Sequence, residues 1–76
     1  MNITELKARL VAEGFDRGVY SVDGTPLPYE GLMLRRAGGE WVIDHFERGV
    51  HRRLATLASE EQACARMHEL LIQYFR

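Results

Sequence analysis

The spacing of hydrophobic residues predicts a helix at each end of the chain. In the first segment, "NITELKARLVAEGF", Asn2 and Glu5 stand where a capping box requires them, and Gly14 can take the left-handed conformation after the last turn. The apolar residues that recur at helical spacing here are Ile3, Leu6, Leu10 and Val11. We therefore expect a first helix over about residues 3–13.

The second helical segment is "SEEQACARMHELLIQYF", which begins at Ser59. Gln62 follows three residues later as the capping-box partner, and Glu60 and Glu61 occupy the first turn, where the helix dipole favours acids. The apolar stripe of this segment consists of Ala63, Cys64, Met67, Leu70, Leu71 and Tyr74. The pattern predicts a second helix over residues 60–75, with a stripe that must be buried against a sheet.

Between the helices, short apolar runs separated by turn residues predict four strands. β-branched and aromatic residues fill "VYSV" at 19–22, and the proline-containing segment "DGTPLP" follows. A glycine pair then separates "LMLRRA" from "EWVIDHFE", and "ERGV" leads into "HRRLATL", so both junctions indicate hairpins. The expected strands are 19–22, 32–37, 40–47 and 51–57.

These elements predict one α+β domain over residues 1–76. The order is α-β-β-β-β-α, and we expect a four-stranded antiparallel meander with two helices packed on one face. So short a chain buries only about 60% of the surface that its unfolded form exposes. The core is therefore small, and stability is expected to be modest.

Side-chain alternation along the third strand divides its residues between two faces. Trp41, Ile43 and His45 share one face, and Val42, Asp44 and Phe46 share the other. We assign Trp41 and Ile43 to the core, so the second set is expected to face solvent. A register error of one residue would exchange the two sets. Phe46 is then either packed at the sheet edge against a long neighbouring side chain or an anchor for a partner.

The charge balance excludes a strong field of one sign. The formal net charge is -1, so nothing global attracts nucleic acid or an acidic membrane surface. The α-β-β-β-α part of the order and the pairs Arg35-Arg36 and Arg52-Arg53 resemble the double-stranded RNA-binding fold. That family places a basic patch at the start of the last helix, whereas this helix begins "SEEQ". We expect neither a nucleic-acid nor a membrane partner, and RNA binding remains a third alternative.

Localisation is predicted from cysteine usage and from the N-terminus. Cys64 is the only cysteine, so the chain has no internal disulfide of the kind that staples small secreted domains. "MNITELKARL" lacks the features of a signal peptide, and no apolar stretch approaches the roughly 18 residues of a membrane span. A cytoplasmic protein is expected.

Candidate catalytic groups are weak. His45, Glu47 and His51 could approach one another as a zinc-like set, but their spacing is not a usual ligand pattern. Cys64 and His68 lie four residues apart as a nucleophile and a base would, yet Cys64 falls on the buried stripe, where a packed inert thiol is favoured. We expect no enzyme, no catalytic residue, no metal and no cofactor.

A protein partner fits the central region better. Charges of both signs concentrate there with aromatic residues between them, as suits an interface in which electrostatics raises the association rate. The alternative is a solvated sheet whose charges keep its edge from pairing with other chains. The residues predicted to contact a partner are Asp44, Phe46, Glu47, Arg48, His51 and Arg53, followed by Tyr29 and Glu30.

Four short stretches occur together along the chain: "NITELKARL", "YSVDG" followed by proline, a tryptophan strand ending "ERG", and "SEEQAC". Together they resemble a family of very small bacterial immunity proteins encoded beside secreted polymorphic toxins. Leu57, where the family has an aromatic residue, and Gln62, where it has an acid, depart from its pattern.

The resemblance implies a cytoplasmic protein that binds a cognate toxin, possesses no cofactor and acts by occlusion. The toxins in question include those that hydrolyse NAD. Acids of the contact set would enter a basic substrate pocket, and Arg48 or Arg53 would pair with catalytic carboxylates. The main alternative is a small regulatory module that forms a homodimer through a two-fold interface.

Overall fold

The computed structural model describes residues 1–76 and has the helix–strands–helix order that the sequence predicts. An α+β fold is therefore confirmed. The elements are α1 (Ile3–Ala12), a 3-10 turn η1 (Arg17–Val19), β1 (Tyr20–Ser21), β2 (Glu30–Ala37), β3 (Glu40–Glu47), β4 (Val50–Leu57) and α2 (Glu60–Phe75).

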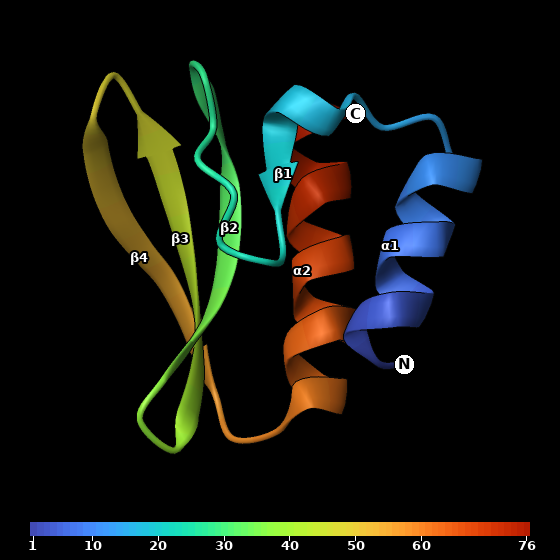
Figure 1. The fold of residues 1–76 in the computed structure, drawn as a ribbon, viewed down its shortest axis with the longest axis vertical. Helices are drawn as coiled ribbons and strands as arrows, with labels where there is room; N and C mark the ends of the chain where they lie inside the picture. Colours follow the sequence, from blue (N-terminus) through green and yellow to red (C-terminus); the bar gives the residue numbers. More distant parts are fainter.

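The sheet forms one layer, and both helices lie on the same side of it (Figure 1). Its strands follow the order β1-β2-β3-β4, so β4 is one edge and the two-residue β1 is the other. The helix α2 packs across β2, β3 and β4, and α1 packs beside α2. Neither helix has the length and the apolar character needed to cross a bilayer.

The helix ends form as their capping residues predict. Asn2 Oδ1 accepts a hydrogen bond from the Glu5 amide at 2.8 Å, and the Asn2 amide donates to Glu5 Oε1 at 3.2 Å. At α2, Ser59 Oγ accepts from the Gln62 amide. The Ile3 amide, which has no partner within α1, donates to Glu60 Oε2 of α2 at 2.9 Å. The two helix N-termini are thereby tied together.

The predicted antiparallel pairing of the first strand is wrong. β1 runs parallel to β2, with Tyr20 beside Leu32 and Ser21 beside Met33, so the sheet is mixed. The chain does not reverse in a tight hairpin after β1 but makes a longer excursion over residues 22–29, which lets β2 begin beside β1 and run in the same direction. Leu27 is buried, so this returning segment packs against the rest of the domain.

Both long hairpins close through two-residue turns. Between β2 and β3, Gly38 has φ +64°. Between β3 and β4, Arg48 has φ 53° and Gly49 has φ 81°, and positive φ at both central residues is the signature of a type I′ turn. This turn type matches the twist of the flanking strands. It is formed although a positive φ is unfavourable for Arg48, which has a Cβ.

The core lies between the sheet and α2 and extends to α1. Its fully buried members include Leu6, Leu10, Leu32, Ile43 and Leu71. Cys64 is also fully buried, and burial raises the pKa of its thiol, as a packed and unreactive cysteine requires. The predicted stripe is wrong at Tyr74, which is 36% exposed and whose ring lies against His45 near the end of α2.

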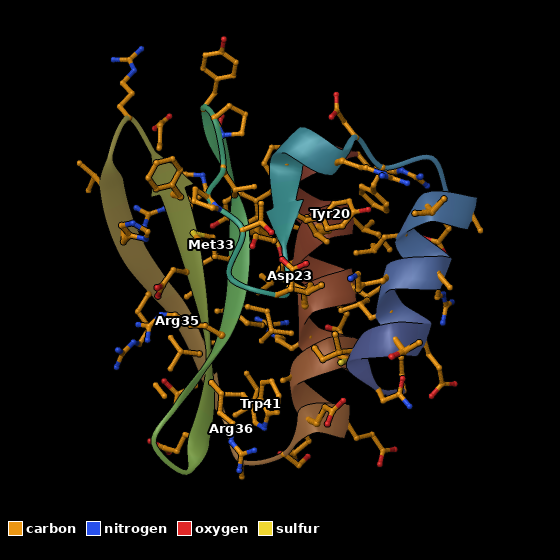
Figure 2. The ribbon with its side chains drawn as sticks, in the orientation of Figure 1. Tyr20, Asp23, Met33, Arg35, Arg36 and Trp41 are labelled. Atoms are coloured by element: carbon orange, nitrogen blue, oxygen red, sulfur yellow. The ribbon has the colours of Figure 1, made fainter.

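The two faces of β3 hold the residues assigned to them. Trp41, Ile43 and His45 share the face of Leu32 and Leu34 that the helices cover. We call the opposite face, which no helix covers, the outer face; it carries Val42, Asp44 and Phe46. Figure 2 shows Trp41 on the helix side of the sheet and Arg35 on the outer side.

The expected exposure of this outer set is wrong for two of its three members. Val42 is 2% exposed and Asp44 is 5% exposed, while Phe46 is half-buried. β3 lies between two strands, and the long side chain of Arg35 reaches over from β2 to contact Asp44. A central strand can therefore bury side chains on a face that no helix covers.

A bulge in β4 changes which of its side chains share a face. Ile43 is opposite Ala55, but the next residue, Asp44, is opposite Arg53, so Leu54 is the extra residue. Without the bulge, alternation would put Arg53 on the face of Ala55. With it, Arg53 lies with Asp44 on the outer face, and Arg52 lies with His45 on the helix side.

Candidate functional site

A hollow of about 480 Å³ opens at the end of the sheet where β2 begins and the β3–β4 hairpin turns. It is lined by Pro28, Tyr29, Glu30, Phe46, Glu47, Arg48 and Gly49. Five predicted contact residues are therefore brought together, from two segments far apart in the chain. We call the surface formed by Tyr29, Glu30, Phe46, Glu47, Arg48 and His51 the hairpin-end surface.

Two aromatic side chains border the hollow. Tyr29 is 82% exposed, the largest exposure among the bulky hydrophobic residues of the chain. Phe46 is half-buried, and its ring packs on the ring of His51 directly across the strands, with centroids 4.9 Å apart. An aromatic side chain left in water is a large source of affinity if a partner covers it.

Two acids face each other at the same end. Glu30 and Glu47 are direct partners in the β2–β3 ladder, and like charges in that position are destabilising. Nε2 of His45 donates to Glu30 Oε2 at 2.8 Å, while the His45 ring packs against Tyr74 with centroids 5.3 Å apart. Glu47 makes no ion pair within the chain. Its carboxylate is available to a cation from outside.

The turn residue Arg48 completes this arrangement. It is the only residue other than glycine with a positive φ, and it makes no ion pair within the chain. A left-handed conformation at a residue with a Cβ costs roughly 1–2 kcal/mol, and glycine or asparagine would relieve it. Arg48 therefore presents its guanidinium at the tip of the hairpin at a cost to stability.

Asp44 and Arg53, the remaining predicted contacts, lie farther along the outer face. Arg35 Nε donates to Asp44 Oδ2 at 3.2 Å, and Arg53 is opposite Asp44 on β4. The Asp44 side chain is almost completely covered, whereas Arg35 remains largely exposed. With its side chain only 7% exposed, Asp44 holds Arg35 in place rather than offering its carboxylate to a partner.

The predicted contact set omits three residues near the hairpin end, namely His45, Val50 and Arg52. Arg52 and Val50 join His45, Glu47 and Arg48 around a second hollow of about 350 Å³ on the helix side of the sheet. The position of Arg52 depends on the bulge, which has no clear signal in "HRRLATL". The bond of His45 to Glu30 depends on a diagonal contact between strands whose register the sequence does not specify.

The weaker catalytic hypotheses receive no geometric support. His45 lies on the helix side and His51 on the outer face, so a set of His45, Glu47 and His51 does not converge. No three or more metal-ligating side chains cluster anywhere in the structure. Cys64 is fully buried, and His68 is bonded to Glu13 of the α1 C-cap.

Comparison with protein-family models, with curated proteins and with solved structures finds no match for this chain. The function is therefore inferred from the geometry of the hairpin-end surface and from the residues that form it.

Proposed function

We propose that this chain is an immunity protein, which binds a cognate bacterial toxin through the hairpin-end surface and covers the toxin's active site. The observation that carries the proposal is the hollow between Tyr29 and Phe46, at an end of the sheet that also holds the opposed acids and the left-handed Arg48. The opposed acids and the left-handed Arg48 each lower the stability of the isolated domain, and local features of that kind concentrate where a protein functions.

The size of the domain is compatible with this role. A standard interface covers about 800 Å² on each partner. The whole chain exposes 4702 Å², so such an interface would take about a sixth of its surface. The hairpin-end surface with the neighbouring part of the outer face provides a continuous area from which this contact can be built.

The charges suit insertion into a catalytic cleft. Glu47 and Arg48 have no partner within the chain and stand next to each other at the hairpin turn. The carboxylate of Glu47 can enter a basic substrate pocket, and the guanidinium of Arg48 can pair with catalytic carboxylates. The family resemblance extends this proposal to toxins that hydrolyse NAD and to action in the cytoplasm of the toxin-producing cell.

The test is a calorimetric titration of this chain with the product of the gene next to its own. Phe46→Ala and Glu47→Arg should each weaken binding by about 30-fold, as removal of a 2 kcal/mol hot spot does. Glu40→Arg is the matched control for Glu47→Arg, because Glu40 is an exposed acid at the opposite end of the same strand. Unchanged affinity in both hairpin-end variants would show that this surface is not the contact.

Sedimentation of the chain alone distinguishes the competing functions. The proposal expects a monomer of 8.7 kDa whose mass increases only with the toxin. A dimer that forms with rising concentration would favour a self-associating module instead. A steeply salt-dependent shift with duplex RNA would favour RNA binding, although Glu60 and Glu61 at the start of α2 oppose a phosphate contact there.

A further inference from the structure

β4 is an edge strand with one side open to solvent. It is the last strand of the sheet and pairs only with β3. Its first part, from Val50 to Arg53, is exposed at every residue, whereas Leu54 and Ala55 are partly covered. Figure 1 shows β4 as the outermost strand, on the far side of the sheet from β1. An open strand edge is a template for pairing with another chain.

The hairpin register determines which backbone groups are free. Glu47 and Val50 flank the two-residue turn, so they exchange both hydrogen bonds with each other. Bonded and non-bonded pairs then alternate, which makes Arg52 the next bonded residue of β4. The N–H and C=O groups of His51 and Arg53 consequently point away from β3, toward the open edge.

The side chains of this segment disfavour pairing with a second copy of the same edge. Antiparallel pairing about a two-fold axis centred on Arg52 or on Arg53 would set that arginine opposite its own equivalent in the other copy. Like charges opposite each other are destabilising, and the bulge at Leu54 twists the strand beyond this point. Self-pairing of the edge in these two registers is therefore disfavoured.

The same charges favour an acidic occupant. We propose that the free edge of β4 from Val50 to Arg53 accepts an extended acidic segment of a partner protein as an added strand. The backbone groups of His51 and Arg53 would bond to the main chain of that segment, which is the source of affinity in strand addition. Arg52 and Arg53 lie on opposite faces, so they would pair with acids at consecutive positions of the added strand, which also point to opposite faces.

The second hollow gives this edge a place for a side chain. It adjoins the segment on the helix side of the sheet and is lined by His45, Glu47, Arg48, Val50 and Arg52. Two arginines outnumber the one acid here, so an acidic side chain of the added strand fits the local charge. Val50, 67% exposed, supplies an apolar contact beside it. The proposal does not require the partner to be a toxin.

The test uses two capped synthetic peptides, one in which pairs of glutamates alternate with pairs of valines and one in which pairs of lysines do, so that each peptide carries charges on both faces of the added strand. Each is titrated into the ¹⁵N-labelled chain and followed by NMR. We expect the glutamate peptide to bind at least tenfold more tightly than the lysine peptide. The amides of His51 and Arg53 should show the largest shifts and become protected from hydrogen exchange, while those of Val50 and Arg52 should change less.

Two variants test the roles of charge and backbone separately. Arg52→Glu should reduce affinity for the glutamate peptide at least tenfold. His51→Pro removes one outward N–H at an edge position that tolerates proline, and it should reduce affinity for both peptides. If either variant fails to fold, the comparison of the two peptides on the unaltered chain still decides.

Absence of binding at millimolar peptide, equal binding of both peptides, or shifts confined to other strands would overturn the proposal. Concentration-dependent shifts at His51 and Arg53 without peptide would overturn the choice of occupant, since they would identify a second copy of the chain. The titration contains peptides and no toxin. Failure of the peptides to bind would therefore leave the proposed immunity function untouched, and failure of the toxin to bind would leave the edge-strand proposal untouched.

Discussion

Nε2 of His68 lies 2.7 Å from Oε1 of Glu13, and this bond joins the middle of α2 to the C-cap of α1. Arg9 Nε lies 3.0 Å from the other carboxylate oxygen of Glu13. The hydrogen bond from His68, followed by that from Arg9, holds the pKa of Glu13 below its ordinary value of 4.5. The ionised carboxylate therefore stabilises the packing of the two helices.

Glu13→Gln tests the resulting pH dependence. Because the pKa of Glu13 is lower in the folded than in the unfolded chain, its stabilising effect is present above its ordinary value of 4.5 and is lost as the pH falls through the lower folded value. Urea unfolding should give the unaltered chain a higher free energy of unfolding than the variant at pH 6, and this difference should shrink toward pH 3. Glu40→Gln, at an exposed acid without an ion pair, is the control and should show no such trend.

Gly31→Ala should destabilise the domain by about 1–3 kcal/mol, as overpacking does. A Cβ at Gly31 would lie 2.5 Å from the Val19 carbonyl oxygen and 2.6 Å from Leu27 Cδ1, so η1 and the returning segment would have to move. Gly39→Ala is the matched control, because open space surrounds that position and its φ is not positive. Equal unfolding free energies for the two variants would contradict this account of the contact between η1 and β2.

Arg48→Gly should stabilise the chain and weaken toxin binding. Glycine relieves the left-handed conformation at the hairpin turn, so the free energy of unfolding should rise by about 1 kcal/mol. The same change removes the guanidinium that the proposed function assigns to the interface. In this one variant, thermal unfolding should therefore show a gain in stability, and calorimetric titration should show a loss of affinity for the toxin. A gain in stability with undiminished binding would remove Arg48 from the contact.

Arg35→Ala should cost about 1–2 kcal/mol, because it leaves the buried carboxylate of Asp44 without the bond that Arg35 provides. The exposure of Arg35 keeps this cost below that of a fully buried pair. The double variant Arg35→Ala, Asp44→Asn should recover part of the loss, and a double-mutant cycle by urea unfolding measures it. Additive effects would show that the two side chains do not interact.

The elements that depend on neighbouring residues were predictable. Ser59 and the apolar stripe specify the bounds of α2, and Asn2 specifies the start of α1. The glycine pair and "ERGV" specify the two hairpins, and the faces of β3 follow from alternation. In each case the deciding interaction spans only a few residues.

The features that depend on distant residues were not predictable. The parallel direction of β1 depends on the path that residues 22–29 take to β2, and the buried carboxylate of Asp44 has its bond from Arg35 on the neighbouring strand. The hairpin-end surface was anticipated as a set of residues. The hollow between Tyr29 and Phe46 was not predictable, because it depends on the β2–β3 register, which the sequence does not specify.

The bond from the Ile3 amide to Glu60 joins two helices that lie at opposite ends of the domain's sequence. α1 is synthesised before α2, but α2 supplies the Glu60 carboxylate and part of the cluster that buries Leu6 and Leu10. α1 can therefore dock only after α2 has been synthesised. The core is completed when the two helices meet rather than piece by piece during translation.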